Sequence, residues 1–408
     1  MTGTRRGVLA LAVALAGGCG APSPPPPDPA DYPDEYTGSA ACRDCHLEIH
    51  DRWSETLMAN VLVDPAERPD VILGDFDNPH PLVTFGPDDV TFTYGSKWKQ
   101  RYFTQRGDDL FVLPAQWDVQ NGEWRRYGPR NEWWVEHYPE DQMERPTGPL
   151  CDGCHSVNYD LPTRTVTEWN VGCEACHGPG REHVFDPVAE TTVNPANLDP
   201  VRATDICIAC HSQGQPHGNP IDGEYVDWPV GFRPGERLSD FWELDPAHLG
   251  EETVTHWQEG SAHKNRMQGN DYVGSMMYVK GVTCTDCHDV HGTEHDADLI
   301  APGNEVCTSC HQPYLQPGPI GSLEYHTQHD PEGEGSSCVA CHMPRIARTI
   351  ADVNVSSHTF RFVSPADTIR YGIPNACTSC HTHADETNEW ALEALREWPQ
   401  VSPWRVAP

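Results

Sequence analysis

Alternating apolar and polar residues mark one clear stretch of β-structure in this chain of 408 residues, between residues 82 and 127. The segment VTFTYGSKWKQRYFT is rich in β-branched and aromatic residues, and LFVLPAQWDV alternates again after the polar turn RGDD. An Asn-Gly pair, which is typical of tight hairpin turns, then precedes WRRY. The pattern predicts a small antiparallel meander over residues 82–127.

Beyond residue 150 the apolar positions follow no sustained period, and Pro and Gly are frequent. We therefore expect short helices and irregular segments, including helix-like pieces between residues 212 and 283 such as TVTHWQEGSAHKNRMQ. The clearest helix is ADETNEWALEALREW, where Leu392 and Leu395 share a face beside Trp390 and Trp398. Hydrophobic residues make up 37% of the chain, which is too few for a large ordinary core, so something else must supply buried apolar area.

The N-terminus has the pattern of an export signal, with Arg5 and Arg6 followed by the apolar run VLALAVALA. That run is too short to span a membrane. Small residues precede Cys19, as in bacterial lipoprotein signals, so we predict that residues 1–18 are removed and Cys19 is lipidated; ordinary signal-peptidase cleavage is the alternative. Residues 19–36 then form a proline-rich tether between a lipid anchor and the rest of the chain.

Cysteine spacing is the strongest signal. The motif Cys-x-x-Cys-His occurs eight times and uses sixteen of the 17 cysteines; the other is Cys19. The sixteen are Cys42, Cys45, Cys151, Cys154, Cys173, Cys176, Cys207, Cys210, Cys284, Cys287, Cys307, Cys310, Cys338, Cys341, Cys377 and Cys380. On a helical turn the two cysteines and the histidine of a motif lean to one face.

That arrangement suits a covalently attached haem c, with two thioethers to the porphyrin and one imidazole on the iron. Zinc sites need no histidine after every cysteine pair, thioredoxin-like pairs occur singly, and disulfide scaffolds are short chains. We therefore predict eight haems, whose porphyrins supply the missing apolar area. The predicted proximal ligands are His46, His155, His177, His211, His288, His311, His342 and His381.

Fourteen of the 22 histidines remain after these eight, enough to give every iron a second imidazole. His291 follows His288 too closely to reach the far side of the same haem, so we expect it to cap a neighbouring one. By the same reasoning the candidate distal ligands are His50, His183, His263, His291, His326, His329 and His358.

The formal net charge is −34, which argues against nucleic acid and bare anionic lipid as partners. A redox partner protein, or a larger electron-transfer complex, is more plausible. The basic segment GSKWKQRY, with Lys97, Lys99 and Arg101, could guide anions to a site, but the solvated face of a strand is the commoner explanation.

Several segments resemble multihaem cytochromes c, the superfamily of the tetrahaem cytochrome of hydroxylamine oxidation, the pentahaem nitrite reductases and octahaem enzymes. They are YTGSAACRDCHLEIHDRW, NVGCEACHGPGREHV, GVTCTDCHDVHG and CVACHMPRIARTIADVNVSSHTFRF. The resemblance implies a mainly α and irregular, haem-organised domain over residues 37–408, with the meander inserted between the first and second motifs. The Cys-x-x-Cys-Lys motif of the nitrite reductases' catalytic haem is absent from the sequence.

Two functions follow. One is an electron-transfer protein that relays electrons through closely packed haems, exported to the periplasm or to the outer membrane and cell surface as a lipoprotein. The alternative is a reductase or oxidoreductase of a small nitrogen or sulfur compound, which needs one haem without a sixth protein ligand. The sequence marks no such haem, so it favours electron transfer and assigns no catalytic residue.

Overall fold

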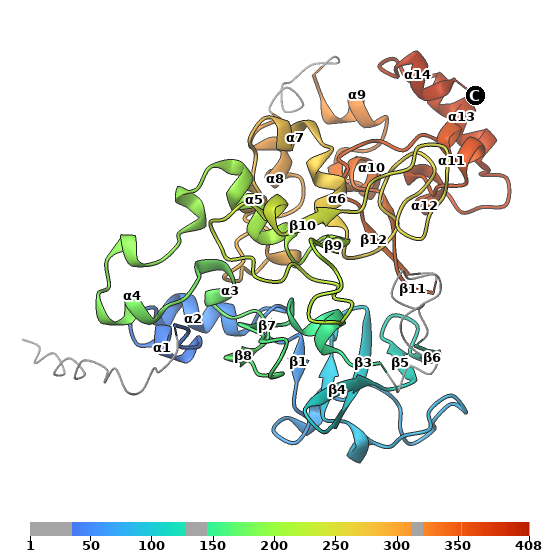
Figure 1. Cartoon of the computed structure of the whole chain (residues 1–408). Coiled ribbons are helices and arrows are strands. Elements are labelled where there is room, and N and C mark those ends of the chain that lie inside the picture. The colour runs from blue at the N-terminus through green and yellow to red at the C-terminus, as the bar shows by residue number, and fades with distance from the viewer. Residues whose placement is uncertain (1–34, 128–144, 312–320, 352, 408) are drawn as a thin grey trace, which may run out of the picture.

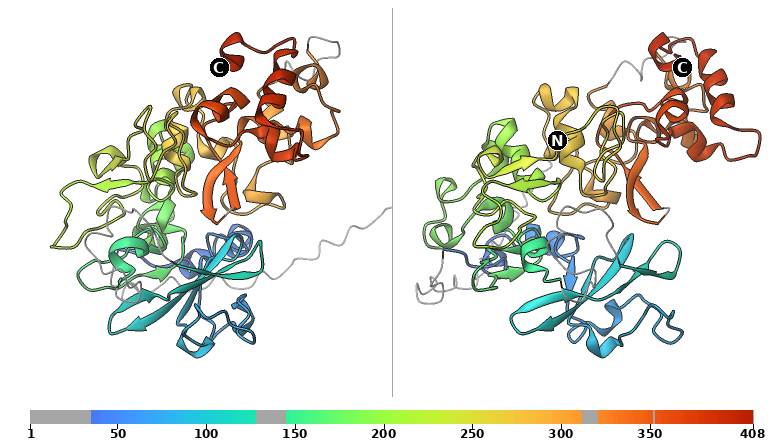
Figure 2. Two further views of the ribbon diagram at one scale, coloured as in Figure 1. Left: turned by 90° about the vertical axis from the view of Figure 1, so that its right-hand side faces the viewer. Right: turned by 45° about the vertical axis from the view of Figure 1, so that its right-hand side comes forward.

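A computed structural model describes residues 35–127, 145–311, 321–351 and 353–407. The predicted signal peptide, Cys19 and the tether up to residue 34 lie outside the described residues. Figure 1 shows an antiparallel sheet at one end of the molecule, with α1 to α4 to one side of it and the helices from α5 onward stacked away from it. The turned views in Figure 2 keep the C-terminal helices at the far end from this sheet.

The sheet has six strands in the order β1-β2-β3-β5-β6, and β4 pairs separately with β3. The strands are β1 (Leu62–Val63), β2 (Phe92–Tyr94), β3 (Lys99–Arg106), β4 (Asp109–Val112), β5 (Ala115–Asp118) and β6 (Glu123–Arg126), all paired antiparallel. Five of the six lie within residues 82–127, and β1 comes from the segment before that range. The sheet therefore includes one short strand, β1, that the alternating pattern of residues 82–127 did not predict.

Each of the two alternating segments of the sequence forms two strands instead of one: the first forms β2 and β3, and the second forms β4 and β5. Between β2 and β3 the chain turns at Gly95, whose φ of +77° is a left-handed conformation that suits glycine. Between β4 and β5 lies Pro114, which has no N–H to donate to a ladder. Neighbours Tyr102 and Phe103 on β3 point to opposite faces and are buried in two separate apolar clusters, so both faces of the sheet are covered.

The helices are short, the longest having nine residues. They are α1 (Ala40–Arg43), α2 (Leu47–Ser54), α3 (Glu174–His177), α4 (Arg181–Phe185), α5 (Pro200–Ile208), α6 (Gln268–Val273), α7 (Met276–Val279), α8 (Glu305–Thr308), α9 (Leu323–Thr327), α10 (Cys338–His342), α11 (Pro365–Tyr371), α12 (Ala376–Cys380), α13 (Asn388–Arg396) and α14 (Pro403–Val406). No helix in the described ranges is long and apolar enough to cross a lipid bilayer.

Three two-stranded antiparallel sheets complete the fold. Their strands are β7 (Ser156–Val157) with β8 (Glu168–Trp169), β9 (Gly214–Pro216) with β10 (Trp242–Leu244), and β11 (Arg345–Ile350) with β12 (Val353–Ser356). The segment from Thr253 to Met267 is not helical, although its pattern predicted helix. It folds back on itself through a turn at Gly260, which has φ +97°, and an antiparallel bridge between His256 and Ala262.

The predicted C-terminal helix is present as α13. The Thr387 hydroxyl caps its first turn by accepting from the Trp390 backbone N–H, and Leu392 and Leu395 are buried. These leucines lie on the same helix face, as the sequence predicted, and α13 packs against α11 and α12. The arrangement brings Trp390 and Trp398 beside the last cysteine motif.

Candidate haem-binding sites

Most of the eight motifs fold as a single helical turn, which places both cysteines and the histidine on one side. In six of them the backbone N–H of the histidine donates to the backbone carbonyl of the first cysteine, at 2.9–3.0 Å in each. The histidines are His46, His177, His211, His288, His311 and His381. The motif of His342 is α10 itself. The Cys151 motif differs, because it leaves a π-helical turn (Gly148–Asp152) and its His155 N–H donates to the Asp152 carbonyl instead.

Five of the eight proximal histidines have a second imidazole facing them. The pairs and the distances between ring centroids are His46 with His183 at 6.3 Å, His177 with His291 at 6.2 Å, His288 with His358 at 6.5 Å, His342 with His326 at 6.1 Å, and His381 with His329 at 6.1 Å. Four pairs are within 27° of parallel, and the His329–His381 pair is tilted by 45°.

This spacing fits an iron held between two imidazoles. Metal–imidazole bonds of about 2 Å, with each ring centroid about 1.1 Å beyond its nitrogen, require centroids about 6.2 Å apart. Rings in direct stacking contact would instead lie closer together. The separation therefore leaves room for a metal but not for a side chain, and the cysteines of each motif are at hand to attach the porphyrin.

Hydrogen bonds set the tautomer that such a ligand needs. The Nδ1 of His177 lies 2.8 Å from the Val193 carbonyl, and the Nδ1 of His288 lies 2.8 Å from the Ala297 carbonyl. A carbonyl only accepts, so the proton is on Nδ1 and the lone pair of Nε2 is free to bind iron. Burial also lowers the pKa of His358 to about 4, which keeps this imidazole neutral.

The second imidazole of each pair comes from another part of the chain. His183 and His291 follow the third and fifth motifs but face the first and third, so each lies opposite the predicted proximal histidine of another motif. His326 and His329, three residues apart on and after α9, face two different motifs. Each pair therefore joins two segments, which makes the haem sites cross-links of the fold.

Two candidate distal histidines face no proximal histidine among the described residues. His50 packs edge-on against Trp53 at 5.3 Å, and His263 lies over Trp257 at 4.7 Å. Three proximal histidines, His155, His211 and His311, are correspondingly without a facing imidazole in the described part of the chain. The residues after His311, up to 320, lie outside it.

His155 faces a tyrosine. The hydroxyl of Tyr94, on β2, lies 2.6 Å from Nε2 of His155, the nitrogen that would bind iron. The ring centroids are 4.8 Å apart and nearly perpendicular. Burial lowers the pKa of His155 to about 3, and burial raises that of Tyr94, so both groups are neutral here. Tyr94 thus hydrogen-bonds the Nε2 atom of His155 directly, whereas at five other motifs a second imidazole faces the histidine with the ring centroids 6.1–6.5 Å apart.

Positive charge surrounds Tyr94. The Arg101 guanidinium lies 5.6 Å from the centre of the Tyr94 ring and 4.5 Å from that of Tyr127. Arg266 donates to Asp227 at 2.7 Å, and both Arg101 and Arg266 act on the charge state of His155. The sequence did not single out Tyr94, because a tyrosine within an alternating strand looks like an ordinary sheet residue.

The basic segment of the meander has mixed roles. Lys97 forms an ion pair with Asp296, and the Lys99 ammonium donates to the Thr349 carbonyl on β11 at 2.6 Å. These two lysines tie the sheet to the rest of the molecule. Arg101 is the member of the segment that lies at the His155 site.

Contacts between cysteines order the motifs in space. The thiols of Cys42 and Cys173 lie close enough to shift each other's pKa, as do those of Cys154 with Cys210, Cys207 with Cys284, and Cys307 with Cys338. A longer-range charge effect on the pKa also relates Cys176 to Cys207, Cys287 to Cys307, and Cys341 to Cys377. The motifs therefore form a row in the order first, third, fourth, fifth, sixth, seventh, eighth. The second motif, that of His155 and Tyr94, branches from the fourth.

This order does not follow the sequence, in which the second, third and fourth motifs lie within residues 151–211 and the first lies far before them. The first motif contacts the third through Cys42 and Cys173, and the Glu168 carboxylate holds Ser39 in the same region. Long-range packing of α1 against the segment before α3 therefore overrides proximity along the chain.

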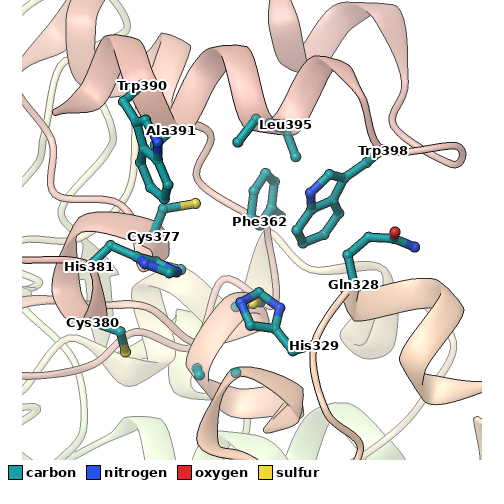
Figure 3. Close-up of a pocket in the computed structure, with 15 residues that line it drawn as sticks. Gln328, His329, Phe362, Cys377, Cys380, His381, Trp390, Ala391, Leu395 and Trp398 are labelled. Atoms are coloured by element: carbon teal, nitrogen blue, oxygen red, sulfur yellow. The ribbon is translucent and has the colours of Figure 1, made fainter. Parts of the chain in front are cut away.

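Figure 3 shows the last site of the row in detail. A cavity is lined by His329, His381, Cys377 and Cys380, and by the aromatic rings of Phe362, Trp390 and Trp398. The two imidazoles point toward each other across it, and the indoles form its upper wall. The lining combines two imidazoles, both cysteines of the last motif and an apolar wall, which is what a haem would require.

Comparisons with known proteins agree with this chemistry. Residues 130–178 match the family described as cytochrome c554 and c-prime, and residues 277–315 match the doubled CXXCH motif family. The chain is a multihaem c-type cytochrome. Covalently bound haem c therefore follows from its motifs and its relatives.

This cytochrome is 28% identical over 149 residues to the multiheme cytochrome MtrA of Shewanella baltica (strain OS185), covering 34% of the chain and 41% of MtrA. It is 21% identical over 395 residues to the dissimilatory sulfite reductase MccA of Wolinella succinogenes, covering 77% of the chain and 51% of MccA. The chain thus spans about half the length, or less, of these relatives. Its fold is similar to the crystal structure of the outer cell wall cytochrome OcwA, with a TM-score of 0.72 and 24% identity, covering 90% and 87% of the two chains.

Proposed function

We propose that this cytochrome is an octahaem electron-transfer protein, which relays electrons between redox partner proteins through eight haems bound at its sixteen motif cysteines. The observation that carries the proposal is the row of neighbouring motifs, whose cysteines act on one another's charge state from Cys42 at one end to Cys377 at the other. Haems attached to adjoining cysteines lie close enough to pass electrons without a diffusing carrier. The similarity to MtrA and OcwA supports electron transfer as the coarse function.

The histidine pairs explain why haems in such a row would transfer electrons and would not bind a substrate. A haem iron changes between ferric and ferrous by one electron, and two imidazole ligands leave it no position for a substrate. At five motifs a second imidazole faces the predicted proximal one, which supports this coordination. The protein's part is to fix both ligands, so that little rearrangement accompanies each electron.

The proposal includes a location. An export signal over residues 1–18 and lipidation at Cys19 would anchor the protein, and the tether to residue 36 would hold the haem domain away from the membrane, in the periplasm or at the cell surface. The net charge of −34 favours a redox partner with a basic docking face.

Low-temperature EPR of the oxidised, haem-loaded protein tests the proposal, together with the intact mass. A mass increase of eight haems and a spectrum dominated by low-spin ferric haem are expected. Fewer haems than eight would contradict the octahaem count, and several high-spin haems would contradict the relay. Repeating the spectrum with nitrite separates the relay from the second function below.

The Tyr94–His155 site favours a second candidate function, reduction or oxidation of a small nitrogen or sulfur compound at this branch haem. Tyr94 stands where a second histidine would otherwise close the iron, and Arg101 beside it would attract an anion. The branch position suits such a site, because electrons reach it from the row at the fourth motif. The similarity to the dissimilatory sulfite reductase MccA points the same way.

Replacing the tyrosine distinguishes this site from the others. The Tyr94→Phe variant should change the nitrite-responsive ferric signal of one haem and leave the other haems untouched. Tyr102→Phe is the matched control, since Tyr102 is a buried tyrosine of the same sheet whose hydroxyl accepts from the Gly74 N–H at 3.1 Å. If no haem of the wild-type protein responds to nitrite, the second candidate is wrong and the relay alone stands.

A further inference from the structure

Two of the five histidine pairs carry a carboxylate at Nδ1 of one imidazole. Nδ1 of His291 lies 3.0 Å from Oδ1 of Asp289, and Nδ1 of His381 lies 3.2 Å from Oε1 of Glu386. The other assigned Nδ1 partners are weaker acceptors. His177, His183, His288 and His329 donate to backbone carbonyls.

Both carboxylates are held in place by additional bonds. Asp289 accepts from the His291 backbone N–H at 3.1 Å and pairs with the Arg52 guanidinium at 3.2 Å. Glu386 accepts from the His383 N–H at 2.9 Å through its second oxygen. The carboxylate of Glu386 is 19% exposed and that of Asp289 34%, so neither hydrogen bond is fully open to water. The two acids are therefore fixed acceptors rather than passing surface charges.

A carboxylate at Nδ1 makes the imidazole a stronger electron donor to the iron, because it draws the Nδ1 proton toward itself. Stronger donation stabilises ferric over ferrous iron, and so does the nearby negative charge, which together lower the reduction potential. A carbonyl or amide acceptor acts in the same direction but more weakly, since it bears no net charge.

We propose that Asp289 and Glu386 lower the reduction potentials of two particular haems, those held by His177 with His291 and by His381 with His329. The inference rests on the proposed relay, within which it assigns a direction. The second of these haems is at the Cys377 end of the row, and its neighbour is held by His326 and His342, whose partners are the Gln400 amide and the Phe360 backbone. An electron that reduces the end haem therefore moves inward to a haem of higher potential, which makes the Cys377 end the donor side.

Spectroelectrochemical titration of the haem-loaded protein tests this inference in two variants that keep side-chain size but remove charge, Glu386→Gln and Asp289→Asn. In each, one one-electron wave should shift to a more positive potential, and the two variants should shift different waves. The matched controls are Glu389→Gln and Glu294→Gln. Both glutamates are exposed and close in sequence to the two sites, and neither hydrogen-bonds an imidazole among the described residues. Their waves should move much less.

Arg52 gives an independent check on Asp289. Arg52→Met leaves the Asp289–His291 contact in place and removes the cation that competes for the carboxylate. The wave that Asp289→Asn raises should then move to a more negative potential, a change of sign that general loosening of the fold would not produce.

The inference is overturned if Glu386→Gln shifts its wave no more than Glu389→Gln does, or if Arg52→Met and Asp289→Asn shift the same wave in one direction. Either result, obtained on a protein that carries eight haems, leaves the proposed relay intact. A wild-type protein that carries fewer than eight haems would instead contradict the proposed octahaem relay. The mass measurement detects this before any titration.

Discussion

His326 is a single side chain that we expect to complete the coordination of one haem. It faces His342 with the rings 10° from parallel and 6.1 Å apart. The His326→Ala variant should leave that iron with five ligands, so one high-spin ferric signal appears in EPR and responds to added imidazole. His217→Ala is the control, because His217 bonds the Ser239 carbonyl and faces no motif histidine among the described residues. An unchanged low-spin spectrum in His326→Ala would remove His326 from the ligand set.

Asp271 couples stability to pH. Burial raises the pKa of Asp271 to about 7, although its carboxylate accepts from the Ala262 N–H at 2.7 Å and the His358 N–H at 3.2 Å. The folded protein therefore retains a proton that the unfolded chain has released above pH 4, and stability falls as the pH rises from about 4 to about 7. Below that window the contribution is fully present.

The Asp271→Asn variant should remove this pH dependence. Its thermal unfolding temperature should exceed that of the wild type at pH 8 and approach it near pH 4, because the amide carries no charge to bury. Asp240→Asn, at an exposed position, is the control and should leave the pH profile unchanged. A wild-type profile that rises between pH 4 and 7 in parallel with Asp271→Asn would contradict the assignment.

At this scale the sequence predicts the residues whose chemistry depends on local spacing. The cysteines and proximal histidines lie within five residues of each other, so a single helical turn assembles them. Tyr94 and Asp289 carry no such signal, because their partners His155 and His291 reach them only through the fold or through a local turn that spacing does not reveal. His183, His291, His326, His329 and His358 face proximal histidines, and the roles of His50 and His263 stay predictions.

At the scale of elements, β3 docks the sheet on β11 through one side chain. The Lys99→Met variant keeps the aliphatic stem of that lysine but removes its bond to the Thr349 carbonyl. We expect a loss of about 1–2 kcal/mol in the protection of the Arg345–Ile350 amides, measured by hydrogen exchange. Lys97→Met is the matched control, since it removes an ion pair with the exposed Asp296 and should cost about 0–1 kcal/mol. Equal effects of the two variants would contradict a specific docking role for Lys99.

Elements are predictable where an apolar face has its own period. The meander strands and α13 follow from alternation and from the spacing of Leu392 and Leu395, because burial of one face dictates both. The segment from Thr253 to Met267 has helix-compatible residues but turns at Gly260 and packs His256 and Trp257 inward. In this segment the tertiary contacts, and not the local helix preference, determine the backbone conformation.

For the whole molecule, a net charge of −34 governs encounters with small redox agents. Reduction of the haem-loaded protein by a cationic reagent such as the hexaammineruthenium(II) ion should slow by roughly tenfold between 10 and 200 mM salt. Reduction by anionic dithionite should accelerate over the same range, and stopped-flow absorbance measures both. An uncharged reductant is the control. Identical salt responses for the cation and the anion would show that local charge near the exposed haem edges outweighs the net charge.

The sequence alone determines the number of motifs and predicts the residues that attach haem and the proximal ligands, because these depend on contacts within one turn of backbone. It also determined the meander and the last helix, where a periodic apolar face must be buried. Only the tertiary structure decided which histidine faces which, that the motifs form a row with the second as a branch, and that Tyr94 and two carboxylates stand at individual sites. Those facts depend on contacts between residues tens to hundreds of positions apart, such as Cys42 with Cys173 and Tyr94 with His155, and spacing along the chain carries no record of them.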